Sequence, residues 1–195
     1  MKQELTPQEA YTRLTTYCAR SEHSPEDIRR KLLSWGIPME EAPAIIKRLE
    51  REGFLSPERF ARAFVRDKYR FNGWGMIRIR AELKRHRIPS GLIDQAIDEL
   101  TEEASDEAEE RLHALLASKL RSLPKSLERR KVWERLLRFG AYRGFPYEEV
   151  QTVIQELLGS SYDEDEPHLP HRSRLPPYLR SLRDTPRAEG ALRLP

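Results

Sequence analysis

The chain has 195 residues, of which 34% are charged and 38% are hydrophobic, and its formal net charge at pH 7 is +3. With so small a hydrophobic fraction, each element can bury only one stripe of apolar side chains. This favours slender amphipathic helices over a large globular core. A single cysteine excludes an internal disulfide and a thiolate metal cluster, and it fits the reducing cytoplasm. No apolar run approaches the roughly 18 residues of a membrane span, so we expect a cytoplasmic protein without membrane contact.

The first part of the chain predicts three short helices. Thr6 and Ser24 are capping residues, each followed by a proline at the first helical position, so a helix is expected to begin after each. Gly36 is expected to end the second helix. A third helix is expected from Pro38 to Gly53, with its apolar positions at helical spacing.

The second part begins with another cap, Ser56, and its first helix is expected to bury Phe60, Ala63, Phe64 and Tyr69. The glycines of segment 71–75 predict a tight turn before the next helix.

That next helix is expected over residues 78–87. A helical period turns Ile79 and Leu83 toward the core and Arg78, Lys84 and Arg85 away from it.

Charge is distributed unevenly over this part of the chain. Residues 59–87 contain ten Lys or Arg and two acids, a formal +8, whereas residues 94–110 contain nine acids and no Lys or Arg. A cluster of cations repels itself unless an anion lies nearby. The anion could be nucleic-acid phosphate, an acidic protein surface, or the chain's own 94–110 segment, which would make the block a salt-bridged surface.

The third part starts near Ala104, and Pro124 is expected to end its first helix. Further helices are expected over residues 126–139 and 147–158. Residues 160–195 hold six of the fourteen prolines and an acidic run, so we expect a disordered tail there.

An internal repeat organises the chain. A shift of 51 positions superposes Ile28 on Ile79 and Leu32 on Leu83, and a weaker third copy carries about four extra residues after Gly140. The fold class is therefore predicted as all-α, with three tandem three-helix, helix-turn-helix-like repeats in an elongated, curved array. The expected repeats span residues 1–55, 56–103 and 104–159, followed by the tail 160–195.

Catalytic and metal-binding patterns are missing from the sequence. Cys18 falls on the inward stripe of a helix, where it acts as a small hydrophobic side chain. His168 and His171 lie around a proline in the tail, which does not preorganise metal ligands. Gly73 and Gly75 flank a Trp and lack the Lys-Ser/Thr of a phosphate loop. We therefore expect no enzyme activity, no catalytic residue, no metal and no cofactor.

The basic block is the candidate binding surface. Its exposed residues are almost all cationic, which suits phosphate contacts better than base readout. Trp74 could stack on a base or simply hold the turn. The candidate residues for contact with a filament or nucleic acid are Arg66, Lys68, Arg70, Trp74, Arg78, Arg80, Lys84, Arg85 and Arg87.

Several ordered motifs within residues 10–158 together resemble the RecX family of bacterial recombination regulators. They are Tyr17-Cys-Ala-Arg-Ser-Glu-His-Ser24, Arg30-Lys-Leu-Leu33, Leu49-Glu-Arg-Glu-Gly-Phe-Leu55, Arg59-Phe-Ala61, Phe64-Val-Arg66, Gly73-Trp-Gly75 and Ile77-Arg-Ile-Arg-Ala-Glu-Leu83. The resemblance implies a non-enzymatic regulator that binds the RecA recombinase and its filament on DNA. We expect a monomer, because an elongated repeat array needs no dimer to bury its core. It further implies inhibition of the ATPase, recombinase and coprotease activities of RecA, and so modulation of DNA repair and the SOS response.

On this resemblance, the 66–87 block faces the nucleoprotein filament and touches DNA phosphates directly. Two alternatives stay open: a free-standing DNA-binding helical-repeat protein that uses the block for phosphate contacts, and an adaptor without a nucleic-acid role. The tail after Gly159 and the four-residue insertion in the third repeat depart from the family pattern.

Overall fold

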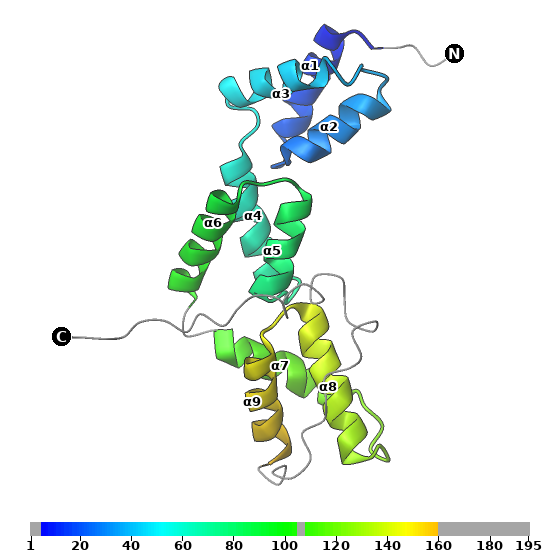
Figure 1. Ribbon diagram of the computed structural model, residues 1–195, viewed down its shortest axis with the longest axis vertical. Coiled ribbons are helices and arrows are strands. Elements are labelled where there is room, and N and C mark those ends of the chain that lie inside the picture. The colour runs from blue at the N-terminus through cyan, green and yellow to red at the C-terminus, as the bar shows by residue number, and fades with distance from the viewer. Residues whose placement is uncertain (1–4, 105–107, 160–195) are drawn as a thin grey trace, which may run out of the picture. The chain divides into compact units, whose positions relative to one another are not determined.

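In the computed structural model, residues 5–104 and 108–159 are described, and every regular element within these ranges is an α-helix. The tail 160–195, for which disorder is predicted, lies outside the described residues. None of the described helices combines the length and apolar character needed to cross a bilayer. In chain order the helices are α1 (Pro7–Cys18), α2 (Pro25–Ser34), α3 (Ala42–Arg51), α4 (Pro57–Arg70), α5 (Met76–Arg85), α6 (Ser90–Glu103), α7 (Ala108–Arg121), α8 (Arg129–Arg143) and α9 (Tyr147–Leu158) (Figure 1).

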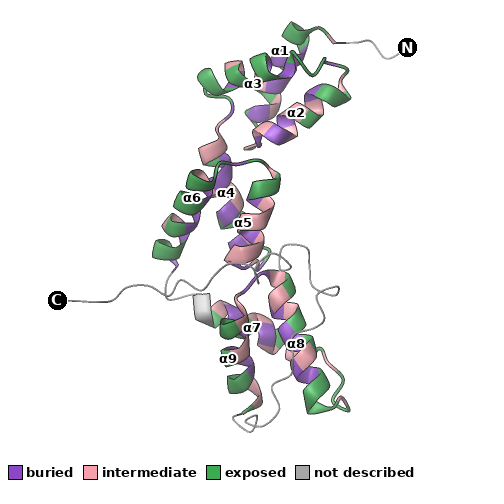
Figure 2. Ribbon diagram, in the orientation of Figure 1, coloured by how far each residue is buried: buried purple, intermediate pink, exposed green. Residues whose placement is uncertain are grey.

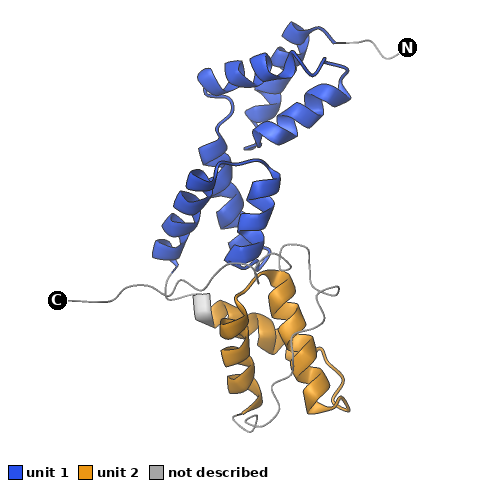
Figure 3. Ribbon diagram, in the orientation of Figure 1, with its two compact units in different colours: residues 1–107 blue, residues 108–195 orange. Residues whose placement is uncertain are grey.

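The helices group into three-helix bundles: α1–α3, α4–α6 and α7–α9 (Figure 1). The chain divides into two compact units (Figure 3). Unit 1, residues 1–107, holds the first two bundles, and unit 2, residues 108–195, holds the third. The repeat boundaries at residues 55, 103 and 159 stay predictions.

Side-chain caps fix where the first helices begin. The Thr6 hydroxyl accepts from the backbone N–H of Glu9 at 3.3 Å, and the Glu9 carboxylate accepts from the N–H of Thr6 at 2.9 Å. Ser24 and Asp27 form the same reciprocal box at the start of α2. These contacts satisfy backbone donors that have no partner inside the helix, and both predicted helix starts are confirmed.

The start of α3 differs from its prediction. The helix begins at Ala42 rather than at Pro38, and the intervening residues form turns. Pro43 explains the shift, because it lies in the first turn of α3, where its missing N–H costs no hydrogen bond. The turn delivers Ile37, which is 2% exposed, to the first core.

Each bundle closes its own hydrophobic core, and the buried residues line the inner faces of the helices (Figure 2). The predicted repeat holds in the first two cores, where Ile28, Ile79, Leu32 and Leu83 are all fully buried. In α4 the prediction needs correction, because Ala61 and Val65 are fully buried whereas Ala63 and Phe64 are only partly covered. The core stripe of α4 is therefore rotated from the predicted one.

Helix α8 corrects the prediction for the third bundle. The helix was expected over residues 126–139, but it runs from Arg129 through Gly140 to Arg143. It stops at Gly144, whose φ of 89° is the left-handed conformation found at helix ends. The four extra residues of the third repeat thus add about one helical turn, which returns the buried face to its original direction.

Polar contacts join the first two bundles inside unit 1. His86, just after α5, has its Nδ1 3.1 Å from the Ser24 hydroxyl and 3.2 Å from an Asp27 carboxylate oxygen. The next residue, Arg87, places its Nε 3.4 Å from the carboxylate of Glu26. Ser24 is fully buried and Glu26 is 8% exposed. The N-terminal turn of α2 is therefore fixed against the end of α5.

Candidate nucleic-acid interface

The α4–α5 turn positions the candidate surface. Gly73 adopts a φ of 61°, which lets the chain reverse directly after α4. The backbone N–H of Trp74 donates to the Lys68 carbonyl at 3.0 Å, so the turn is closed by a hydrogen bond. Gly75 then serves as the N-cap of α5.

Trp74 anchors this turn through its indole ring. The ring packs against the second core and meets Phe64 edge-on at 6.3 Å between centroids. The Arg78 guanidinium carbon lies 3.9 Å from the Trp74 ring centroid, and the Lys68 Nζ lies 5.2 Å from it. Cations over an aromatic ring are held by its quadrupole. Trp74 therefore holds two of the candidate cations at the turn.

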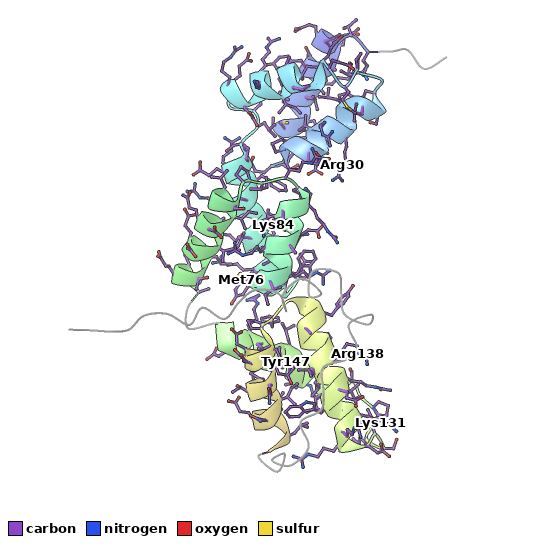
Figure 4. All side chains as sticks on the ribbon, in the orientation of Figure 1. Arg30, Met76, Lys84, Lys131, Arg138 and Tyr147 are labelled. Carbon is purple, nitrogen blue, oxygen red and sulfur yellow. The ribbon has the colours of Figure 1, made fainter. Side chains whose placement is uncertain are left out.

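Helix α5 carries the remaining outward cations. Because Ile79 and Leu83 are fully buried in the second core, the helix cannot rotate, and Lys84 and Arg85 are exposed on its other side. Lys84 has no ion pair within residues 5–104, whereas Arg85 pairs with Glu82 at 3.2 Å on the same helix. Figure 4 shows Lys84 on α5, in the second bundle.

The cations of α4 meet the acids of α6. Arg62 forms two hydrogen bonds with the carboxylate of Glu99, at 2.7 and 2.8 Å, and Arg66 and Arg70 share Glu103 at 3.4 and 3.5 Å. The hydrogen bonds from the Arg62 guanidinium keep the pKa of Glu99 below its usual value. This side of the basic block is therefore neutralised by the chain's own acidic segment.

Two further candidate arginines form ion pairs with acids of other helices. Arg80 at the middle of α5 forms an ion pair with Asp94 of α6. Arg87 pairs with Glu26 of the first bundle and has a φ of 57°, a left-handed conformation that disfavours any residue with a side chain. These arginines contribute to the packing of helices as well as to the positive surface.

The nine candidates thus separate by their surroundings. Arg66, Arg70, Arg80 and Arg87 pair with acids from other helices, Lys68 and Arg78 lie over Trp74, and Lys84 and Arg85 project from α5.

Phe71 belongs to this surface and was not singled out from the sequence. It is 83% exposed, directly after α4 and beside Arg70. Its spacing from Phe60 and Phe64 is helical and would have placed it on the core stripe. Because α4 ends at Arg70, Phe71 leaves that stripe and faces solvent. The turn predicted over residues 71–75 places Phe71 outside the helix, but it does not tell whether the ring packs inward or faces solvent.

Groups of acidic, His and Cys side chains suited to a metal are absent from the part of the chain that the structure describes. Burial raises the pKa of the Cys18 thiol, which is 8% exposed, so it is a poor nucleophile. His168 and His171 lie outside the described residues.

The family comparisons match two of the three bundles. RecX, second three-helix domain, matches residues 58–97, and RecX, third three-helix domain, matches residues 106–154. Among solved structures, a crystal structure of regulatory protein RecX superposes with a TM-score of 0.67 at 22% identity, covering 75% of this chain and 72% of that one. RecX from Lactobacillus salivarius superposes with a TM-score of 0.63 at 20% identity, covering 77% of this chain and 96% of that one.

Sequence relatives cover most of the chain. Regulatory protein RecX of Pelodictyon phaeoclathratiforme is 31% identical over 145 residues, which are 74% of this chain and 86% of the relative. Regulatory protein RecX of Pseudomonas entomophila is 35% identical over 137 residues, which are 70% of this chain and 83% of the relative. With the same all-helical fold and the same ordered domains, the chain belongs to the RecX family of regulatory proteins.

Proposed function

We propose that this chain is a non-enzymatic regulator of the RecA recombinase. It binds RecA and the RecA filament on DNA and inhibits the ATPase, recombinase and coprotease activities, and thereby modulates DNA repair and the SOS response. The observation that carries the proposal is RecX family membership, combined with an outward cationic surface on α5 and its turn.

The α5 surface suits a long anionic partner. Lys84 and Arg85 project from a helix whose inner face is fixed in the core, and Arg78 is held over the Trp74 ring, so binding orders few additional groups. The flanking ion pairs of Arg66 and Arg70 with Glu103 are exposed and 3.4 to 3.5 Å long. Pairs of this kind contribute about 0–1 kcal/mol. Phosphates or acidic protein groups can therefore replace Glu103 at little cost.

In the proposed mode of action the chain covers part of the RecA filament and catalyses no reaction. A regulator that covers part of a filament changes its activities by binding one state of the filament better than another. Each bundle closes its own core, so a monomer has all that this mode requires.

The test is ATP hydrolysis by RecA on single-stranded DNA, with the full chain added up to equimolar amounts. We expect hydrolysis to slow, and we expect the triple variant Arg78→Ala/Lys84→Ala/Arg85→Ala to inhibit at least tenfold less per molecule, given about 1.4 kcal/mol per factor of ten. The matched control is Arg13→Ala/Arg20→Ala/Lys47→Ala, which removes the same charge from exposed positions of the first bundle. Undiminished hydrolysis at equimolar protein contradicts the proposal.

A second candidate function is binding to DNA without RecA. The exposed Phe71 beside Arg70 favours it, because aromatic rings next to cations are typical of single-strand binding surfaces. This function predicts binding to DNA alone, weakening steeply with salt, and loss of that binding in the α5 triple variant. If the chain inhibits RecA but does not bind DNA in the absence of RecA, the second candidate is excluded and the first remains.

A further inference from the structure

Unit 2 carries a second cationic segment outside the basic block. Residues 119–143 contain nine Lys or Arg and two acids, a formal +7. Most of them lie on α8, and the spacing of Lys131, Arg135, Arg138 and Tyr142 puts these four residues along one stripe of that helix. All four are exposed.

The stripe is oriented by the opposite side of α8. Trp133 is 1% exposed and Leu136 is fully buried in the third core, so the helix cannot turn the stripe inward. In Figure 4, Lys131 and Arg138 extend from the side of α8 away from Tyr147 of α9. Tyr142, 55% exposed, lies at the C-terminal end of the stripe.

The two acids near the stripe pair with Lys131, at the N-terminal end of the stripe, and with Arg130, which lies outside it. Glu128 pairs with Lys131 at 3.0 Å, and Glu134 pairs with Arg130 at 3.4 Å. Arg135 and Arg138 form no ion pair with the side chains described between residues 110 and 159. Like charges three or four positions apart on a helix destabilise it, so α8 keeps an unfavourable arrangement that an anionic ligand would relieve.

We propose that this outer face of α8 binds the sugar–phosphate backbone of single-stranded nucleic acid. Arg135 and Arg138 contact phosphates, and Tyr142 stacks on an unpaired base. Guanidinium groups match phosphate oxygens with paired N–H donors. An exposed aromatic ring at the end of a cationic stripe favours a single strand, whose bases are open to stacking, over a duplex. The stripe lies in a different unit from α5 and is a separate attachment point that needs no RecA.

The experiment measures binding of the full chain to a fluorescent oligo(dT) without RecA, over a series of salt concentrations. Each single-strand phosphate contact contributes about 0.7 to the log–log salt slope. The variant Arg135→Ala/Arg138→Ala should flatten the slope by about 1.4 and weaken binding about 25-fold at 0.1 M salt. The variant Arg135→Lys/Arg138→Lys should keep most of the slope, because it keeps both charges.

The matched control is Arg13→Ala/Lys47→Ala, which removes two exposed cations from the first bundle and should leave the slope unchanged. Tyr142→Ala should weaken binding about fivefold or more without changing the slope, because stacking is not electrostatic. If the α8 double variant binds oligo(dT) as tightly as the control variant, the proposal is overturned. RecA is absent from the assay, so this result leaves the RecA proposal untouched, and inhibition of RecA is scored separately.

Discussion

Arg87 and Gly36 occupy equivalent positions after the second helix of their bundles, and both have left-handed backbones, with φ values of 57° and 84°. Glycine adopts this conformation without steric cost, whereas a residue with a side chain pays about 1–3 kcal/mol. Arg87 keeps the strained conformation while its side chain pairs with Glu26 across the joint between bundles.

This relationship predicts an unusual ranking of variants at position 87. We expect Arg87→Gly to be more stable than Arg87→Ala by about 1 kcal/mol, because only glycine relieves the strain after the ion pair is lost in both. Urea unfolding measured by circular dichroism provides the comparison. An alanine variant as stable as the glycine variant would show that the left-handed backbone carries no strain.

An added methyl group at Gly140 is expected to lower the stability of unit 2. A Cβ at this position would lie 2.6 Å from both Cγ atoms of Val150, which is fully buried in the third core. We expect Gly140→Ala to destabilise unit 2 by about 1–3 kcal/mol through overpacking, detected by fluorescence of the buried Trp133. The control is Gly91→Ala in α6, where a Cβ meets no atom within 4 Å. Its expected effect is neutral or stabilising, because alanine favours helix.

Ser24 predicts a larger capping effect than Thr6. Both cap a helix through the backbone N–H three residues on, but Ser24 is fully buried and also contacts His86, whereas Thr6 is exposed. We expect Ser24→Ala to cost about 1–2 kcal/mol and Thr6→Ala about 0.5–1 kcal/mol, by thermal and urea unfolding. If both variants lose the same free energy of unfolding, the Ser24 hydroxyl does not stabilise the contact between the first two bundles.

His23 predicts sensitivity to mild acid. Burial lowers the pKa of its imidazole, which stacks on Tyr17 at 4.0 Å between centroids. Because the pKa of His23 is lower in the folded state, the unfolded state binds the proton more readily. Stability is therefore complete above the unfolded pKa of about 6.5 and declines as the pH falls through the folded pKa.

We expect the urea midpoint to be lower at pH 5.5 than at pH 7.5, and the difference to shrink in His23→Gln, which cannot be protonated. His113→Gln is the control, because His113 is exposed on α7. If the pH effect persists in His23→Gln and disappears in His113→Gln, the sensitivity comes from His113 in the third bundle, and the prediction for His23 is wrong.

Local signals in the sequence were sufficient for much of the fold. The caps at Thr6, Ser24 and Ser56 sit next to the helices that they start, and the 51-residue shift pairs Ile28 with Ile79 in equivalent cores. These features depend on neighbours within one or two turns, which a sequence displays directly.

Features that depend on how helices meet could not be predicted. The pairing of Arg66 and Arg70 with Glu103 exists because α4 packs along α6. The sequence allowed this pairing as one of three anion sources and could not choose among them. The helix predicted over residues 126–139 ends before Tyr142, so the sequence does not place Tyr142 in line with Arg135 and Arg138.

The extra turn of α8 has a consequence for how such bundles can diverge. An insertion of four residues restores the angular phase of a helix to within a few tens of degrees, so Leu136 and Gly140 before it and Phe145 after it all face the third core. An insertion of two residues would instead turn everything downstream by more than half a circle and drive arginines into the apolar interior. This helix can therefore be lengthened by about one turn without turning its buried face away from the core, and each such step adds about 6 Å to its outer face.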